Sequence, residues 1–224
     1  MNNLTLLLLS AVILNAITFS SSVLSQTKIT IVDQNNNPLP NTVIEFVASN
    51  SISQQPAATQ SDQLYVMDQV NKSFVPHVLV VPTNSLVSFP NSDDIRHHVY
   101  SFSPAKTFEL KLYAGKPKNP VRFDQNGVVV MGCNIHDSMV GYIYVSEKES
   151  SYLTDIEGAA MLPTNLAVNT QLQVWHPNSE KGVSAHTIFT VEQSMLSDNQ
   201  VTLILPVNSP APRDSFETLV FDEL

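Results

Sequence analysis

Gly132-Cys133-Asn134-Ile135-His136-Asp137-Ser138-Met139 is the stretch from which fold and chemistry can be predicted together. It contains the only cysteine among the 224 residues, a histidine three positions later and a methionine three positions after that. Runs of β-branched and aromatic residues flank it, in Gly127–Met131 and in Val140–Val145. Such runs are typical of β-strands, so the stretch is predicted to form a tight loop between two strands.

The loop offers three soft metal donors close together, the Cys133 thiolate, the His136 imidazole and the Met139 thioether. This combination favours copper, which in such sites is held by two His and one Cys in a trigonal arrangement with a long axial Met. A zinc site would prefer further Cys or His ligands. A dinuclear copper centre would need a second cysteine, which the sequence lacks. The second histidine must therefore come from another part of the chain.

The stretch Asn91–Val99 offers this second histidine, because a polar turn leads there into an alternating strand that contains His97 and His98. Neighbouring residues of a regular strand point to opposite faces, so only one of the two can be the ligand. The remaining histidines, which are expected to be structural or at the surface, are His77, His176 and His186.

Residues 62–146 resemble the cupredoxins, the group that contains plastocyanin, pseudoazurin and amicyanin. That family carries Phe-x-Asn, His-Asn-Val, Cys-x-x-His and a Met. The corresponding residues here are Phe89-Pro90-Asn91, His97-His98-Val99, Cys133-Asn134-Ile135-His136 and Met139. The same runs are also similar to bacterial exported proteins named methylamine utilisation proteins.

The resemblance implies a Greek-key β-sandwich that binds one copper ion through His97, Cys133, His136 and an axial Met139. His98 stands where the family has Asn, and it is the alternative to His97 as ligand. Asn91 is expected to support the centre by side-chain hydrogen bonds that tie the histidine loop to the cysteine loop.

The chain on either side of this segment resembles a carboxypeptidase regulatory-like β-sandwich, with turn signatures in Asn37–Asn41 and Thr154–Gly158. The expected fold is therefore all-β, with the cupredoxin sandwich (62–146) inserted into or joined to a second, smaller β-sandwich. A first hairpin with a linker (26–61) and the segment 147–206 would form that second sandwich.

The two ends of the chain are expected to lie outside both sandwiches. Residues 1–25 contain no Asp, Glu, Lys or Arg and have a short apolar core, which is typical of a secretory signal cleaved after Ser25. The apolar run is shorter than the roughly 20 residues that span a bilayer, so no transmembrane segment is expected after cleavage. The predicted location is the periplasm or the exterior. Residues 207–224 are Pro-rich and then acidic, which predicts a flexible tail.

The net charge of −9 argues against nucleic acid as a partner. Four protein donors around the copper leave no open position for a substrate, so we expect no enzyme activity. The predicted function is one-electron transfer between redox partner proteins by a blue copper centre. The alternative is a periplasmic copper carrier or storage protein, or an interaction module, in which copper does not transfer electrons.

Overall fold

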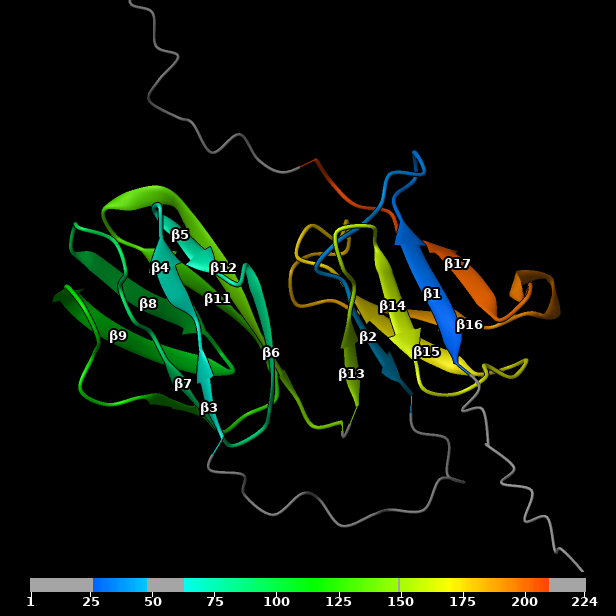
Figure 1. The fold of residues 1–224 in the computed structure, drawn as a ribbon, viewed down its shortest axis with the longest axis horizontal. Helices are drawn as coiled ribbons and strands as arrows, with labels where there is room; N and C mark the ends of the chain where they lie inside the picture. Colours follow the sequence, from blue (N-terminus) through cyan, green and yellow to red (C-terminus); the bar gives the residue numbers. More distant parts are fainter. Residues whose placement is uncertain (1–25, 48–62, 149, 210–224) are drawn as a thin grey trace, which may run out of the picture.

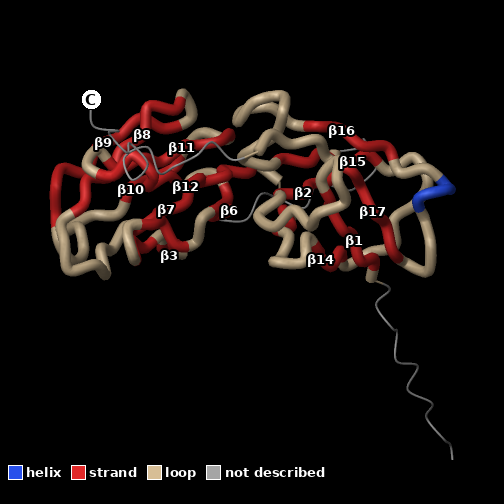
Figure 2. The backbone as a smooth tube through the Cα atoms, turned by 90° about the horizontal axis from the view of Figure 1, so that it is seen from above, coloured by secondary structure: helices blue, strands red, loops and turns tan. Residues whose placement is uncertain are grey.

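Short runs rich in β-branched and aromatic residues form strands throughout the part of the chain that the computed structural model describes, residues 26–47, 63–148 and 150–209. The strands build two β-sandwiches that lie side by side (Figure 1), and the view from above shows the same two bodies (Figure 2). In these ranges the one helical element is a 3-10 turn, Gln193–Met195. The predicted all-β fold is therefore confirmed.

Three predicted segments fall outside this description. They are the secretory signal (1–25), the linker (48–61) and all but the first residues of the tail (207–224). Within the described ranges, the chain forms no helix with the length and apolar character that a bilayer crossing requires.

The first sandwich contains a five-stranded sheet. In spatial order its strands are β6 (Val78–Pro82), β12 (His136–Ser146), β11 (Gly127–Cys133), β8 (His97–Ser103) and β9 (Lys106–Tyr113). The smaller sheets are β10 (Val121–Phe123), β7 (Ser85–Ser88) and β3 (Leu64–Val66), and the hairpin of β4 (Asp68–Val70) and β5 (Ser73–Val75). Apolar side chains from β5, β6, β7, β8, β10, β11 and β12, together with Met67 and Phe89 from connecting segments, form one buried core. β3 and β9 add partly buried side chains to it.

Alternate residues of the five-stranded sheet face opposite sides, and β12 is buried on both of them. Met139, Ile143 and Val145 face the core of the first sandwich, whereas Tyr142 and Tyr144 belong to a separate buried cluster. This two-residue period follows from the pleat of a strand. It places Met139 on the same face of the sheet as Cys133, which belongs to the same core.

The second sandwich combines strands from the two ends of the described chain. One sheet has the order β14 (Ala159–Leu162), β1 (Thr27–Val32) and β17 (Gln200–Ile204), and the other has β13 (Ser151–Leu153), β2 (Val43–Phe46), β15 (Gln171–Trp175) and β16 (Thr187–Thr190). In Figure 1 the blue β1 lies beside the orange β17, with which it pairs in parallel. Strands that precede and follow the first sandwich thus share both sheets.

The predicted first hairpin is wrong, because β1 and β2 lie in different sheets. β1 pairs with β14 and β17, and β2 pairs with β13 and β15. The turn after β1 does fold back for one residue, since the Leu39 N–H donates to Ile31 O at 2.9 Å. Pro40 then lacks a donor, and Asn41, with φ of 61°, redirects the chain to the opposite sheet. Ile31 and Ile44 consequently contribute to the same core from opposite layers.

The two sandwiches are joined across the outer face of the five-stranded sheet. Trp175 of the second sandwich is fully buried, and its ring lies 5.9 Å from that of Tyr142 and 5.4 Å from that of Tyr144, between ring centroids. Val43, also from the second sandwich, belongs to the same buried cluster as Val78 and these aromatic residues. Aromatic pairs of this kind contribute about 0.5–1.5 kcal/mol beyond the burial of their area.

A buried carboxylate adds a polar clamp to this apolar junction. Glu45 of β2 is 2% exposed and accepts hydrogen bonds from Tyr144 Oη at 3.0 Å, from Ser151 Oγ at 2.6 Å and from Ser146 Oγ. Tyr144 and Ser146 belong to β12, whose first residue is His136. Burial, reinforced by the negative charge of Glu45, raises the pKa of Tyr144, so its hydroxyl keeps the proton that it donates. The second sandwich therefore holds the far end of β12.

We predict that Glu45→Ala lowers the free energy of unfolding by about 3 kcal/mol, because three hydroxyl donors lose a buried acceptor. Tyr144→Phe, which removes one donor, should cost about 1 kcal/mol. Urea denaturation of the purified protein measures both values. The control is Glu157→Ala at an exposed position. If Glu45→Ala changed stability no more than this control, the clamp would have no energetic role.

Candidate metal centre

Cys133 is the last residue of β11, where the regular pairing with β12 shifts register. Beyond the shift Cys133 pairs directly with His136, so Asn134 and Ile135 form the whole loop between the two strands. Cys133 also pairs with Val99 of β8 on its other side. Cys133 is 3% exposed and is a free cysteine. The predicted tight loop between two strands is confirmed.

His97 opens β8 and is fully buried. Its Nδ1 atom lies 3.7 Å from Cys133 Sγ. The pairing of β8 with β9 shifts register between His97 and Val99, so the strand is irregular where the histidine enters the core.

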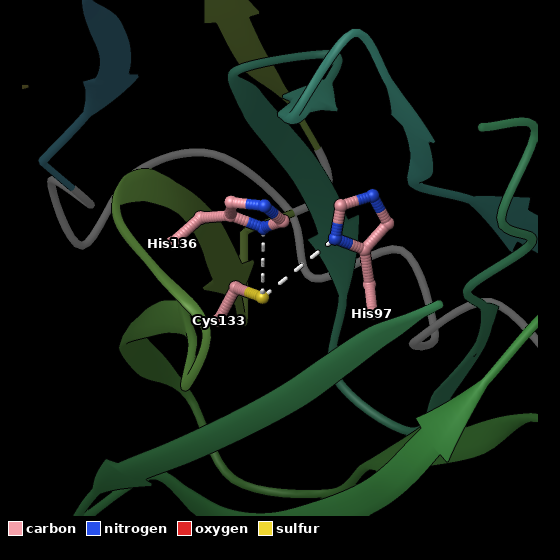
Figure 3. Close-up of side chains that lie close together, drawn as sticks. All are labelled: His97, Cys133 and His136. Carbon is pink, nitrogen blue, oxygen red and sulfur yellow. Dashed lines mark hydrogen bonds between the residues drawn. The ribbon is translucent and has the colours of Figure 1, made fainter. Parts of the chain in front are cut away.

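His136 completes the group from the first position of β12, with Nδ1 3.8 Å from Cys133 Sγ. Figure 3 shows both imidazole rings turned so that a nitrogen of each faces the sulfur. The ring centroids of His97 and His136 are 5.0 Å apart, and one donor atom from each of the three residues lies within 4.8 Å of the others. Partial burial, and then the neighbouring His97 and Lys72, lower the pKa of His136. The lower pKa favours the neutral imidazole, which is the form that binds metals.

These distances fit a single metal ion between the three donors. Bonds of about 2.3 Å to sulfur and about 2.0 Å to nitrogen, about 120° apart, place the two donor atoms about 3.7 Å from each other. The observed separations of 3.7 and 3.8 Å agree with that value. One thiolate and two imidazoles in a trigonal arrangement are the donor set of a type 1 copper site. The centre therefore fits one copper ion per chain.

Met139 is 1% exposed and lies in the buried core that contains Cys133. The strand period places its side chain on the inner face of the sheet, where Cys133 also lies. The position is compatible with the predicted axial ligand, and the ligation itself stays a prediction.

His98 lies away from this group. Its Nε2 atom is 2.9 Å from Glu109 Oε1 of β9, and its ring is 5.7 Å from that of Tyr100, between centroids. His98, Tyr100 and Phe102 share the outer face of β8, where Phe102 is 79% exposed. The structure therefore brings His97, and not the alternative His98, to Cys133.

Asn91 stabilises the histidine loop by bonds different from those expected. Its Nδ2 donates to Ile95 O at 2.8 Å and to Tyr113 O at 3.0 Å, and its Oδ1 accepts from the Asp93 N–H at 3.1 Å. These contacts tie the loop to the end of β9, whereas the expected contact was with the cysteine loop. The reason is that Asn91 sits in a bridge to Gly115, just past β9.

Asp93 is a residue of the centre that the sequence analysis missed. Its Oδ2 lies 2.7 Å from His97 Nε2, the ring nitrogen that faces away from Cys133. Burial alone would raise the pKa of Asp93, but hydrogen bonds from the Lys72 N–H, His97 and the Asn71 N–H outweigh burial and lower it. The only signal in the sequence was an acidic residue four positions before the histidine.

The other histidines lie outside the centre, in line with their predicted structural roles. His176 is buried, and burial lowers its pKa to about 4. Its Nδ1 accepts from the Asn178 N–H at 3.1 Å. His186 Nε2 is 3.0 Å from Tyr144 Oη at the junction of the sandwiches.

A scan against protein families finds no match, and no curated protein matches the chain. Similar solved structures include a copper-containing nitrite reductase (NirK) from Thermus scotoductus SA-01, 24% identical over 46% of this chain, with a TM-score of 0.36. That match spans 26% of the reductase chain.

Two smaller proteins are also similar in structure. A purple cupredoxin from Nitrosopumilus maritimus is 22% identical over 38% of this chain and 100% of its own, with a TM-score of 0.33. A pseudoazurin from Methylobacterium extorquens AM1 is 21% identical over 38% of this chain and 77% of its own, with a TM-score of 0.33. Because these TM-scores are below 0.5, the likenesses do not decide the family of this chain.

We predict that His97→Ala weakens Cu(II) binding by more than about 100-fold, because loss of a ligand costs more than the 10–100-fold typical of supporting residues. His98→Ala serves as the matched control and should leave the affinity unchanged, since His98 faces Glu109. Titration of each variant with Cu(II) against a competing chelator measures the affinities. Equal losses in the two variants would contradict the assignment of His97.

Proposed function

We propose that this chain is a mononuclear blue copper protein with a cupredoxin-like first sandwich, and that it carries single electrons between redox partner proteins. The observation that supports this most directly is the buried Cys133 sulfur with two imidazole Nδ1 atoms at 3.7 and 3.8 Å. In this proposal His97, Cys133 and His136 form the trigonal plane, and Met139 is the weak axial ligand that tunes the potential.

The rigidity of the three donors supports electron transfer. Cys133 and His136 are fixed by adjacent strand pairing, and His97 is fully buried between Cys133 and Asp93. Copper supplies the one-electron couple when it is bound. The chain's part is to hold three donors in one arrangement for both oxidation states, since little then has to rearrange when the electron moves.

The exposure of the donors supports one route for the electron. His97 and Cys133 are buried, whereas His136 is partly exposed and follows Ile135, which is 50% exposed. We propose that a redox partner docks over this apolar edge, and that the electron passes through the His136 ring. A partner that docked against the second sandwich would instead lie at the far end of β12, away from His136.

A carrier rather than an enzyme is proposed, because the three buried or partly buried donors and the predicted Met139 leave no open ligand position. We also propose that the protein acts in the periplasm or outside the cell. The proposed location rests on the signal-like composition of residues 1–25.

Addition of one equivalent of Cu(II) to the purified protein should give an intense thiolate-to-copper absorption band in the visible range. Reductant should bleach the band and oxidant should restore it. Cys133→Ala should lack the band, because it lacks the thiolate, whereas Ser138→Ala, an exposed change in the same segment, should keep it.

The same experiment separates the rival functions. A protein that binds copper tightly without the band would contradict electron transfer by a blue centre and favour a copper carrier or storage protein. Failure to bind Cu(II) or Cu(I) would contradict every copper function proposed for the chain.

A further inference from the structure

We propose that Asp93 is a positioning residue of the copper centre, which fixes the orientation of His97 and lowers the reduction potential through the hydrogen bond to its ring. The inference rests on the proposed copper function and extends it to a residue that does not bind the metal. It is carried by contacts on the side of His97 that faces away from Cys133.

Both nitrogens of the His97 ring are engaged. Nδ1 lies 3.7 Å from Cys133 Sγ, and Nε2 lies 2.7 Å from Asp93 Oδ2. A carboxylate oxygen accepts hydrogen bonds, so Nε2 carries the hydrogen. The lone pair of the neutral ring is then on Nδ1, directed at the metal position. Carboxylates commonly orient metal-binding histidines in this way.

Asp93 is itself held in place by two backbone donors from the turn between β4 and β5. Its Oδ1 accepts from the Asn71 N–H at 2.6 Å, and its Oδ2 accepts from the Lys72 N–H at 3.0 Å. Both turn residues have left-handed φ values, 51° and 57°, and in this conformation successive N–H groups point in one direction. The carboxylate thus connects this turn to His97 across the sequence.

The peptide of Asp93 is fixed as well. Its N–H donates to Asn91 Oδ1 at 3.1 Å, and Asn91 is anchored to Tyr113 O at 3.0 Å. The side chain of Asp93 is 11% exposed, so water competes little for the bond to His97. The position of the His97 ring is therefore set by contacts that do not depend on the metal.

The two histidines of the centre differ in whether a carboxylate is hydrogen-bonded to the ring. Within the part of the chain that the structure describes, the hydrogen bonds of His136 include no carboxylate partner. The hydrogen-bonded carboxylate accordingly lies on the buried, His97 side of the centre. This arrangement separates tuning of the potential at His97 from electron exchange at His136.

The Asp93 carboxylate favours Cu(II) over Cu(I). Cu(II) with the Cys133 thiolate carries one positive charge, and Cu(I) with the thiolate carries none. A nearby negative charge in poorly hydrated surroundings stabilises the first state more than the second. The hydrogen bond also makes the ring a stronger donor to the metal. Both effects lower the reduction potential.

The test is the reduction potential of copper-loaded Asp93→Asn, which keeps the size of the side chain and removes its charge. We expect the affinity for Cu(II) relative to Cu(I) to fall about tenfold, within the range for supporting residues. This corresponds to a rise of about 59 mV for a one-electron couple. Asp94→Asn is the matched control, since it removes the same charge at the adjacent, exposed position and should leave the potential unchanged.

Three outcomes overturn the proposal. An unchanged potential in Asp93→Asn, or an equal shift in Asp94→Asn, excludes a specific effect of Asp93. A wild-type protein without a thiolate-to-copper band removes the copper function and the role of Asp93 with it, and this failure is seen before any variant is compared.

A measurement on the wild-type protein does not depend on the folding of the variant. Nitrogen-15 NMR of the diamagnetic Cu(I) form should show His97 protonated at Nε2 with a slowly exchanging hydrogen. A His97 ring protonated at Nδ1, or an Nε2 hydrogen that exchanges as fast as that of His136, would contradict the bond to Asp93.

Discussion

The contact on which the first sandwich depends is that of the Cys133 sulfur with the two imidazole rings at one end of the five-stranded sheet. It requires β8, β11 and β12 to be neighbours, because each contributes one donor. The register shifts next to Cys133 and His97 are the local adjustments that turn these side chains toward each other. Irregular pairing of this kind is common beside functional sites, where it redirects a side chain. If the register of the Gly132–Val140 pair continued unshifted, Cys133 would lie opposite Met139, and the shift places it opposite His136.

The second sandwich influences the position of this centre through its contacts with β12 and not by direct contact. It covers the outer face of the sheet with Trp175 and binds Tyr144 and Ser146 through Glu45. β12 is therefore buried on both faces over most of its length, and His136 projects from the end that remains partly exposed. The end of the sheet that holds Ile135 and His136 stays accessible. A strand fixed on both sides also limits the movement of His136 when the metal is lost or changes its charge.

Much of the centre could be predicted because short patterns, each of a few neighbouring residues, indicate it. Cys133 and His136 are separated by two residues between clear strand patterns, and two-residue alternation showed that only one of His97 and His98 could face the core. The hairpin of β1 and β2 was predicted wrongly, because both strands are apolar and the sequence does not indicate that Asn41 redirects the chain to the other sheet. Asp93 was missed because its role depends on the Asn71–Lys72 turn, which is distant in sequence.

The central claim is that the chain holds its three donors in place before copper binds. Crystal structures of the metal-free and the Cu(II)-loaded protein test this claim most directly. The account predicts that Cys133 Sγ and the Nδ1 atoms of His97 and His136 differ by less than about 0.5 Å between the two forms, the tolerance expected of a preorganised site. A metal-free structure in which either histidine has rotated away from the sulfur, or copper held by His98, would contradict the account.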